Sequence, residues 1–213
     1  MKLNNQIIQI ACDGGAATGK STGAKMIAKK YKLKFLSSGL LYRYASHLLI
    51  KYNPENKITF LHKKFKKLNY KNINQINLHT QEISNISAII AKKNSIRKIL
   101  KNFQIAFVKK NKNCCIEGRD ISTKILPYSN IKFFFKCNLD IAAYRRHKEL
   151  KKRNNKIKLK DVKKALRIRN NHDVKRKNSP LKKHRNAIEI DTGKLNKQEM
   201  LNKMSKYVEK LLN

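Results

Sequence analysis

The segment Gly14–Thr22, GGAATGKST, constrains this chain more than any other part of its sequence. An apolar run, Ile7–Cys12, precedes it, and apolar residues at helical spacing follow in Lys20–Tyr31, so the predicted order is strand, glycine-rich loop and helix. Glycines let successive backbone N–H groups turn toward phosphate oxygens, and a helix N-terminus adds partial positive charge. Lys20 is expected to contact the β- and γ-phosphates of a nucleoside triphosphate, and the Ser21 hydroxyl is expected to hold Mg²⁺. The segment therefore predicts a site for ATP or a similar nucleotide, formed by Gly14, Gly15, Ala16, Ala17, Thr18, Gly19, Lys20, Ser21 and Thr22.

Apolar runs and helical periodicities alternate along the rest of the chain. Runs of β-branched and aromatic residues predict strands at Lys34–Leu36, Cys114–Ile116, Ile131–Phe135 and Ala187–Ile190. Helical spacing predicts helices from about residue 38 to Tyr52, over Gln81–Lys109 with a break near Asn94, over Ala142–Arg169 with a break near Asn154, and over Lys197–Leu212. Strands that alternate with helices predict a three-layer α/β fold, in which helices cover both faces of a mainly parallel sheet.

The bulk properties indicate a folded protein of the cytoplasm. A length of 213 residues suits a single α/β domain with its own core. No apolar run approaches the ~20 residues that span a bilayer, and the first residues lack the long apolar region of a signal peptide. The four cysteines show no CxxC spacing and lie in or beside apolar runs, which indicates buried free thiols. We therefore expect a cytoplasmic protein without membrane contact.

The formal net charge of +38 arises from 51 Lys and Arg residues against 13 Asp and Glu residues. Such a charge attracts nucleotides, but it attracts RNA and membrane surfaces as well. Lys, Asn and Ile are frequent in every segment, as expected from the codon usage of an AT-rich genome, and no single basic patch carries interleaved aromatic residues. The charge therefore favours biased composition over a dedicated nucleic-acid-binding surface.

A segment that ends in an arginine, SGLLYR at residues 38–43, follows the second predicted strand. The carboxyl ends of parallel strands open into one crevice, so Arg43 can approach the glycine-rich loop. The alternative is a helix capped by Ser38 and followed by a solvated arginine.

A second polar segment, EGRD at residues 117–120, follows the strand predicted at Cys114–Ile116 and opens into the same crevice. The guanidinium of Arg119 suits a phosphate, and the carboxylate of Asp120 can accept from an amino group or organise Mg²⁺-bound water. The alternative is a turn with an internal ion pair, but the position at a strand end favours a functional role.

Further arginines occur on the later predicted helices. Arg169, Asp173 and Arg176 have the spacing i, i+4 and i+7 and are expected to lie on one helix face. A surface ladder of ion pairs is the alternative for these three. Arg145 and Arg146, taken by themselves, indicate a solvated basic helix surface.

Together, several segments resemble the bacterial cytidylate kinases, which are P-loop nucleoside monophosphate kinases. These segments are GGAATGKST, SSGLLYR, EGRDIST, and RNNHDVKRKNSPL followed by AIEIDT. The resemblance extends in one order from about Ile7 to Leu195 and so covers most of the chain. The first segment is shared by many nucleotide-binding proteins, whereas the combination is much more specific. The sequence shows neither the GFPR segment of adenylate kinases nor the DR pair of thymidylate kinases.

The resemblance implies transfer of the γ-phosphoryl group of ATP, with Mg²⁺, to CMP or dCMP, without a covalent enzyme intermediate. It implies one nucleoside monophosphate kinase domain with a core at about residues 1–43, 99–150 and 171–213. A shortened monophosphate-binding insertion would occupy about residues 44–98, and a helical lid about residues 151–170. The implied partners are the small molecules ATP, CMP and dCMP, and the implied state is a monomer.

The resemblance also implies roles for individual residues. The catalytic residues would be Lys20, Arg119 and Arg145. The CMP-binding residues would be Ser38, Tyr42, Arg43, Arg119, Asp120, Arg169, Asp173 and Arg176. The lid residues would be Arg145, Arg146 and Arg153, and the metal ligand would be Ser21.

The sequence departs from the family pattern at several positions. His79 stands where similar enzymes carry an arginine beside the base, Glu117 and Asn170 stand where aspartates are usual, and Ser122 replaces a glycine. The segment between Arg43 and His79 is short, so the small added sheet of the relatives is expected to be reduced. Two alternatives stay open: a kinase of another nucleotide or of a polynucleotide end on the same fold, and a basic RNA-binding protein with a vestigial glycine-rich loop.

Overall fold

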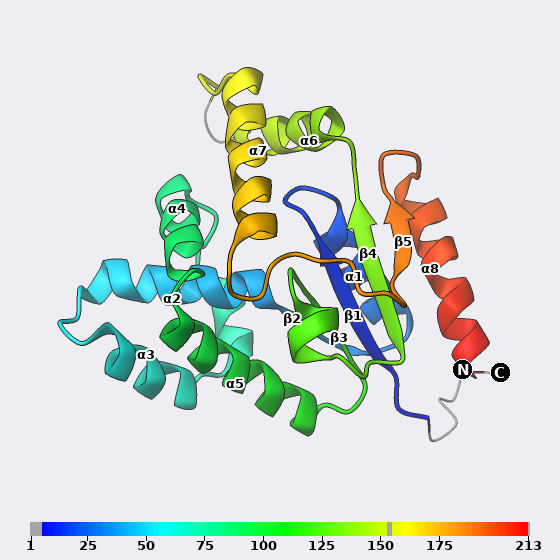
Figure 1. Cartoon of the computed structure of the whole chain (residues 1–213), viewed down its shortest axis with the longest axis horizontal. Coiled ribbons are helices and arrows are strands. Elements are labelled where there is room, and N and C mark those ends of the chain that lie inside the picture. Colours follow the sequence, from blue (N-terminus) through cyan, green and yellow to red (C-terminus); the bar gives the residue numbers. More distant parts are fainter. Residues whose placement is uncertain (1–5, 153–154, 213) are drawn as a thin grey trace. The chain divides into compact units, whose positions relative to one another are not determined.

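The strands of this chain form one parallel sheet (Figure 1). The computed structural model describes residues 6–152 and 155–212. Within this part the sheet has five strands in the order β2-β3-β1-β4-β5. The strands are β1 (Gln9–Gly14), β2 (Lys34–Ser37), β3 (Cys114–Gly118), β4 (Ile131–Lys136) and β5 (Ile188–Asp191). β1 pairs in parallel with β3 and β4, and β4 with β5, so the predicted α/β fold with a mainly parallel sheet is confirmed.

The position of β1 decides where a ligand can bind. β1 lies between β3 and β4, so the chain leaves it toward one edge of the sheet and later returns to its other side. In an open parallel sheet, such a reversal of strand order leaves a crevice outside the carboxyl ends of the strands. The glycine-rich loop follows β1 directly at this point.

The chain divides into two compact units. One comprises Met1–Leu36 and Lys112–Asn213 and holds the sheet, and we call it the sheet unit. The other comprises Ser37–Asn111, and we call it the helical unit. The helical unit includes the segment expected as an insertion at about residues 44–98, and the function of that segment stays a prediction.

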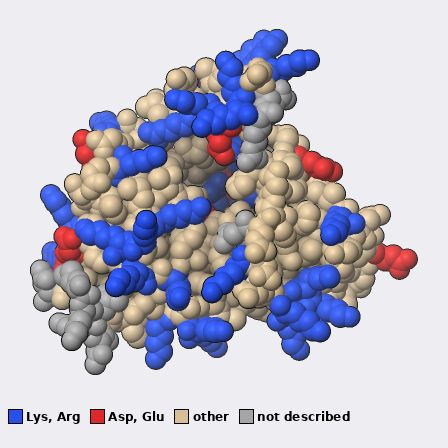
Figure 2. Space-filling model, turned by 180° about the vertical axis from the view of Figure 1, so that it is seen from behind, with Lys and Arg blue, Asp and Glu red and all other residues tan. Residues whose placement is uncertain are grey.

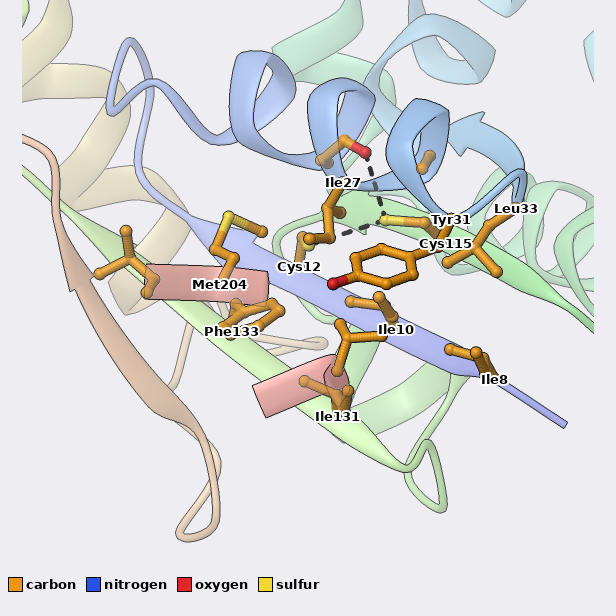
Figure 3. Close-up of a cluster of buried hydrophobic side chains, with 14 of the residues drawn as sticks. Ile8, Ile10, Cys12, Ile27, Tyr31, Leu33, Cys115, Ile131, Phe133 and Met204 are labelled. Carbon is orange, nitrogen blue, oxygen red and sulfur yellow. Dashed lines mark hydrogen bonds between the residues drawn. The ribbon is translucent and has the colours of Figure 1, made fainter. Parts of the chain in front are cut away.

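Alternate residues of β1 define the main core of the sheet unit (Figure 3). Ile10 and Cys12 are fully buried on the face that is covered by α1 (Lys20–Lys30) and α8 (Lys197–Leu212). Ile27 of α1 and Met204 of α8 are fully buried in the same cluster. Successive side chains of a strand point to opposite faces, so the same alternation turns Asp13 toward the other face of the sheet.

The four cysteines are free thiols. Cys12, Cys114 and Cys115 are buried, as predicted, whereas Cys137 is only partly buried. The Sγ atoms of Cys12 and Cys115 lie 3.9 Å apart (Figure 3). Burial raises the pKa of Cys114 to about 12 and holds the pKa of Cys12 well above its usual value, so these thiols stay protonated and unreactive at neutral pH.

Two basic helices, α6 (Leu139–Lys151) and α7 (Leu159–Lys175), pack against each other in the sheet unit. Ala143 of α6 and Leu166 of α7 belong to a small buried cluster that also contains Ala16 of the glycine-rich loop. This cluster places α7 beside the loop. The helix predicted over Ala142–Arg169 with one break is confirmed as these two helices.

The helical unit contains α2 (Ser38–Tyr52), α3 (Lys57–Lys66), a 3-10 turn η1 (Tyr70–Gln75), α4 (Gln81–Ile90) and α5 (Asn94–Lys110). The predicted break near Asn94 is confirmed as the boundary between α4 and α5. Ser37, and not Ser38, caps α2, since the Ser37 hydroxyl accepts from the Leu40 N–H at 3.3 Å. Residues 38–111 contain no strand, in agreement with a reduced added sheet.

Among the residues that the structure describes, no helix combines the length and the apolar character needed to cross a bilayer.

Candidate functional site

The glycine-rich loop connects β1 to α1 in the predicted way. Gly19 adopts a left-handed backbone (φ 74°), which glycine tolerates best, and α1 begins at Lys20. A Cβ atom on Gly14 would lie 2.5 Å from the backbone oxygen of Phe135 in β4, so only glycine fits at the end of β1. The loop therefore needs its glycines both for its turns and for its close approach to the neighbouring strand.

Lys20 is buried in the first turn of α1 and forms an ion pair with Glu117 at the end of β3. Burial lowers the pKa of Lys20, and the negative charge of Glu117 opposes this shift. The register of the sheet explains the contact, because Glu117 pairs with Cys12 of β1, two residues before the loop. Sequence reasoning noted Glu117 only as a departure from the family pattern and missed its contact with Lys20.

Ser21 follows in the same turn, and its side chain is exposed. A hydroxyl oxygen is a suitable ligand for Mg²⁺, which prefers oxygen and is usually held by few protein groups together with substrate phosphates. No group of three or more His, Cys, Asp or Glu side chains among the described residues could hold a metal ion. The Ser21 hydroxyl therefore fits an ion that arrives with a nucleotide.

Asn170 of α7 reaches the glycine-rich loop from the other side. Its Oδ1 atom accepts a hydrogen bond from the Ala16 N–H at 3.0 Å. The same oxygen would lie 3.2 Å from a Cβ atom on Gly15, which leaves little room for any other residue there. Asn170 thus holds one of the backbone donors that the loop was predicted to direct at phosphate.

A cluster of arginines and carboxylates lies at the carboxyl end of β3 and on α7. The Nε atom of Arg119 donates to Oδ2 of Asp173 at 2.7 Å. Nη1 of Arg176 lies 3.5 Å from Oδ1 of Asp173, and Nη2 of Arg176 lies 3.9 Å from Oδ1 of Asp120. Burial alone would raise the pKa of Asp173, but Arg119, with Arg169 and Arg176, outweighs burial and lowers it. The structure thus brings together five of the residues predicted to bind CMP.

The geometry of this cluster differs from the expected helix face. Arg176 follows α7 as its C-terminal cap, in extended backbone (φ −63°, ψ 137°), so the three residues do not share one helical face. The Nε atom of Arg176 donates to the backbone oxygen of Ser179 at 2.7 Å. The chain therefore turns Arg176 back toward Asp173 after the helix has ended, and the two side chains of this ion pair are only 10% and 16% exposed.

A buried carboxylate, Asp13, connects the end of β1 to the turn that follows Asp120. Its Oδ1 atom accepts from the Ile121 N–H at 2.7 Å, and its Oδ2 atom accepts from the N–H and the hydroxyl of Ser122 at 2.7 and 2.5 Å. Burial raises the pKa of Asp13, although the hydrogen bonds from Ser122 and Ile121 oppose the shift. Sequence reasoning missed Asp13, and the only available signal was its position between a buried strand and the glycine-rich loop.

The two arginines predicted for the lid on α6 have different surroundings. Arg145 donates from Nη1 to the Thr192 hydroxyl at 3.0 Å and from Nη2 to the Thr192 backbone oxygen at 2.7 Å, so it is not a freely solvated surface residue. Arg146 forms an ion pair with Glu149 on its own helix at 2.8 Å. The third predicted lid residue, Arg153, lies outside the described residues.

The remaining predicted site residues belong to the helical unit. Arg43 donates to the backbone oxygen of Leu78 at 2.8 Å and to the Ser84 hydroxyl at 3.3 Å. Tyr42 lies one residue earlier on α2. The guanidinium carbon of Arg97 lies over the Tyr42 ring, 5.7 Å from the ring centroid. Ser38 is buried at the start of α2. The grouping of these three residues with those of the sheet unit stays a prediction.

Basic side chains lie at many places on the face of the molecule that is seen in Figure 2. Figure 2 shows Lys and Arg side chains in several separate groups over the visible face, with few Asp or Glu side chains among them. This distribution agrees with the scattered basic residues of the sequence, which carries 51 Lys and Arg residues.

Comparisons with known proteins show the family of the chain. The profile of the family described as "Cytidylate kinase" matches residues 10–210. The chain is 36% identical over 191 residues to a cytidylate kinase of Bartonella tribocorum, with 87% of each chain covered. It is 33% identical to a cytidylate kinase of Clostridium tetani, with 95% of this chain and 94% of the relative covered.

Solved structures share the fold at lower identity. The crystal structure of an uncharacterized protein from Eubacterium ventriosum matches with a TM-score of 0.57 and 18% identity, and covers 95% of this chain and 98% of that one. The structure of TT1252 from Thermus thermophilus matches with a TM-score of 0.54 and 15% identity, covering 98% and 100%. These likenesses concern the fold alone. The family profile and the full-length relatives, together with the loop and the arginine cluster, show that the chain belongs to the cytidylate kinase family.

Proposed function

We propose that this protein transfers the γ-phosphoryl group of ATP to the phosphate of CMP or dCMP, giving ADP and CDP or dCDP. A phosphate oxygen of the acceptor forms a bond to the γ-phosphorus as the bond to the β-phosphate oxygen breaks. The observation that carries this proposal is the cluster of Arg119, Arg176, Asp120 and Asp173, which lies at the carboxyl end of the strand next to β1. A second anionic ligand beside the triphosphate loop requires such guanidinium groups.

The donor side is the loop Gly14–Thr22. Its backbone N–H groups and the start of α1 would bind the triphosphate, and Lys20 would exchange Glu117 for the β- and γ-phosphates. Mg²⁺ would arrive with ATP, held by the Ser21 hydroxyl, and would neutralise charge that develops on the phosphoryl group. Arg145 would contact the triphosphate from α6, and Arg146 and Arg153 would belong to the same lid.

The acceptor side comprises the residues that the family resemblance assigns to CMP. Arg43, Arg119 and Arg176 would bind the monophosphate. Asp120 would accept from the cytosine amino group, and Arg169 and Asp173 would reach the ribose. The site would be completed by Ser38 and Tyr42. Catalysis then consists of positioning and charge neutralisation, since the transfer needs no covalent intermediate.

We further propose that the protein works as a cytoplasmic monomer and that its charge reflects composition. A kinase of a different acceptor and an RNA-binding protein are the competing functions. Two features support an active kinase: the ion pair of Lys20 with Glu117, and the arginine cluster. A vestigial site has no reason to retain both.

The test is ADP production from ATP and Mg²⁺ with CMP, dCMP, UMP, dTMP and AMP supplied in turn. We expect turnover with CMP and dCMP and little with AMP or dTMP. Lys20→Ala serves as the control for contaminating kinases and should abolish turnover. Tight RNA binding without turnover of any mononucleotide would refute the proposal. Efficient turnover of another mononucleotide, without turnover of CMP or dCMP, would show that this mononucleotide is the acceptor.

A further inference from the structure

Thr192 follows β5 and connects two parts of the candidate site that are distant in sequence. Its hydroxyl donates to the backbone oxygen of Thr18 in the glycine-rich loop at 2.9 Å. The same hydroxyl accepts from Nη1 of Arg145 at 3.0 Å, while the Thr192 backbone oxygen accepts from Nη2 at 2.7 Å. One residue therefore contacts the loop that binds the donor and the arginine that was predicted to act on it.

The position of Thr192 is fixed from several sides. Its side chain and backbone are almost fully buried, with 3% of the residue exposed. Its N–H donates to the backbone oxygen of Lys136 at 3.0 Å, which continues the pairing of β5 with β4, and its hydroxyl lies 3.4 Å from that same oxygen. Its methyl group lies 3.4 Å from the place of a Cβ atom on Gly19. The sheet thus holds the hydroxyl in place before any ligand binds.

The contacts define the orientation of the Arg145 guanidinium. Two bonds from Nη1 and Nη2 to one residue fix both the position and the plane of the group, as a bidentate contact does. The guanidinium carries five N–H donors, and the described residues engage it through Thr192 and, at 3.7 Å, through Sγ of Cys137. The guanidinium thus has donors beyond those that fix its orientation.

We propose that Thr192 is a positioning residue that holds the Arg145 guanidinium beside the glycine-rich loop, in the orientation that acts on the triphosphate of ATP. This inference rests on the proposed function, because it takes Arg145 to contact the bound nucleotide. The threonine hydroxyl suits the task, since it can donate to a carbonyl oxygen and accept from a guanidinium at the same time. An arginine with a long flexible side chain loses less freedom on binding phosphate when it is already oriented.

A pair of substitutions separates this role from a merely structural one. Thr192→Val keeps the branched shape, the methyl packing and the backbone oxygen, but it removes the hydroxyl. Thr192→Ser keeps the hydroxyl and removes the methyl group. We expect Thr192→Val to lower kcat/KM for ATP by about tenfold, because a hydrogen bond to a charged group is lost. We expect Thr192→Ser to stay within about threefold of the wild type, and KM for CMP to change little in either variant.

A double-mutant cycle with Arg145→Ala supplies the decisive comparison. If Thr192 acts through Arg145, the fold-decrease in kcat/KM for ATP caused by Arg145→Ala is several-fold smaller in the Thr192→Val background than in the wild type. Fold-decreases in kcat/KM that simply multiply in the double variant would overturn the inference. Equal decreases in Thr192→Val and Thr192→Ser, with a lower Tm in both, would overturn it too. Unchanged kinetics of Thr192→Val while Arg145→Ala remains impaired would overturn it as well and leave the proposed function intact.

Direct binding of a fluorescent ATP analogue to the wild type, Thr192→Val and Thr192→Ser keeps the two proposals apart. We expect weaker binding to Thr192→Val than to Thr192→Ser. If the wild type turned over no CMP, the proposed acceptor would be wrong, and the binding series would still decide the role of Thr192. Equal binding to the Val, Ser and wild-type proteins would refute that role.

Discussion

The carboxylate of Asp13 accepts hydrogen bonds from both the backbone N–H and the hydroxyl of Ser122, at 2.7 and 2.5 Å. Asp13 is the penultimate residue of the strand that leads into the glycine-rich loop, and Ser122 is the second residue of the short π-helix η2 (Ile121–Ile125), which follows Arg119 and Asp120. One buried side chain therefore joins the segment that would bind the donor to the segment that would bind the acceptor. The replacement of the family glycine by Ser122 adds a hydrogen bond at this junction.

Loss of the Ser122 hydroxyl is expected to affect the acceptor side. Ser122→Ala removes one of three hydrogen bonds to Asp13 and leaves both backbone contacts in place, so the turn loosens without unfolding. We expect KM for CMP to rise about threefold to tenfold and KM for ATP to stay within twofold. Steady-state kinetics with each substrate varied in turn measure this. A change confined to ATP would contradict the predicted division of the site.

Removal of the Glu117 charge is expected to destabilise the free protein more than the ATP-bound protein. Glu117→Gln leaves Lys20 buried without its carboxylate partner, and breaking a buried ion pair from one side costs about 3 kcal/mol. Bound phosphates would supply a new partner for Lys20. Thermal unfolding with and without ATP and Mg²⁺ should therefore show a lower Tm for the free variant and a larger upward shift on ligand addition than in the wild type. An equal shift in both proteins would show that Lys20 does not exchange partners.

Arg119 is expected to matter mainly for the monophosphate. Arg119→Ala removes a guanidinium that is already oriented by Asp173, and we expect KM for CMP to rise at least about tenfold with ATP affinity little changed. Arg119→Lys keeps the charge but not the forked geometry, and we expect only a partial recovery. Kinetics with CMP and binding of an ATP analogue measure the two sides separately. Unchanged CMP kinetics in Arg119→Ala would disprove the assignment.

The lowered pKa of Asp173 predicts a dependence of stability on acid. A carboxylate whose pKa is lower in the folded state stabilises that state at pH values above its unfolded pKa of about 4, and this contribution is lost as pH falls through the folded pKa. Asp173→Asn lacks the contribution and leaves Arg119 without its partner, which costs about 3 kcal/mol at neutral pH.

Urea unfolding of the wild type and of Asp173→Asn at pH 7, 5 and 3 measures the effect. The free energy of unfolding should be higher for the wild type than for Asp173→Asn. This difference should be largest at pH 7, remain at pH 5 and begin to shrink at pH 3. The comparison between the two proteins separates Asp173 from other carboxylates that titrate in the same range. A difference that is constant from pH 7 to pH 3 would show that the Asp173 carboxylate is not stabilised by its arginines.

Much of the fold followed from local patterns. The strand before Gly14, the helix after Gly19 and the closing helix Lys197–Leu212 were predicted because apolar spacing reports directly which face of an element is buried. Boundaries were less accurate: Ser37 rather than Ser38 caps α2, because a capping hydroxyl must lie outside the helix that it caps. Arg176 lies beyond α7, since spacing alone does not show where a helix ends.

The candidate site divides in the same way. Lys20 and Arg119 could be predicted because each follows a recognisable strand at a position where parallel strands open into a crevice. Asp13 and Thr192 carry no such signal, and Glu117, which follows the same predicted strand as Arg119, has nothing in its residue type that indicates a contact with Lys20. An aspartate or glutamate at the end of a strand, or a threonine after one, occurs in many proteins without a role.

The sequence by itself determined the glycine-rich loop, the order of strands and helices and the family, since these depend on residue types at short spacing. Only the tertiary structure decided which side chains hold the glycine-rich loop and the neighbouring segments in place. Thr192 meets the loop across 174 residues of sequence, and Asp13 meets Ser122 across 109. Such contacts depend on strand order and register, which bring distant residues within hydrogen-bond distance and which no local pattern encodes.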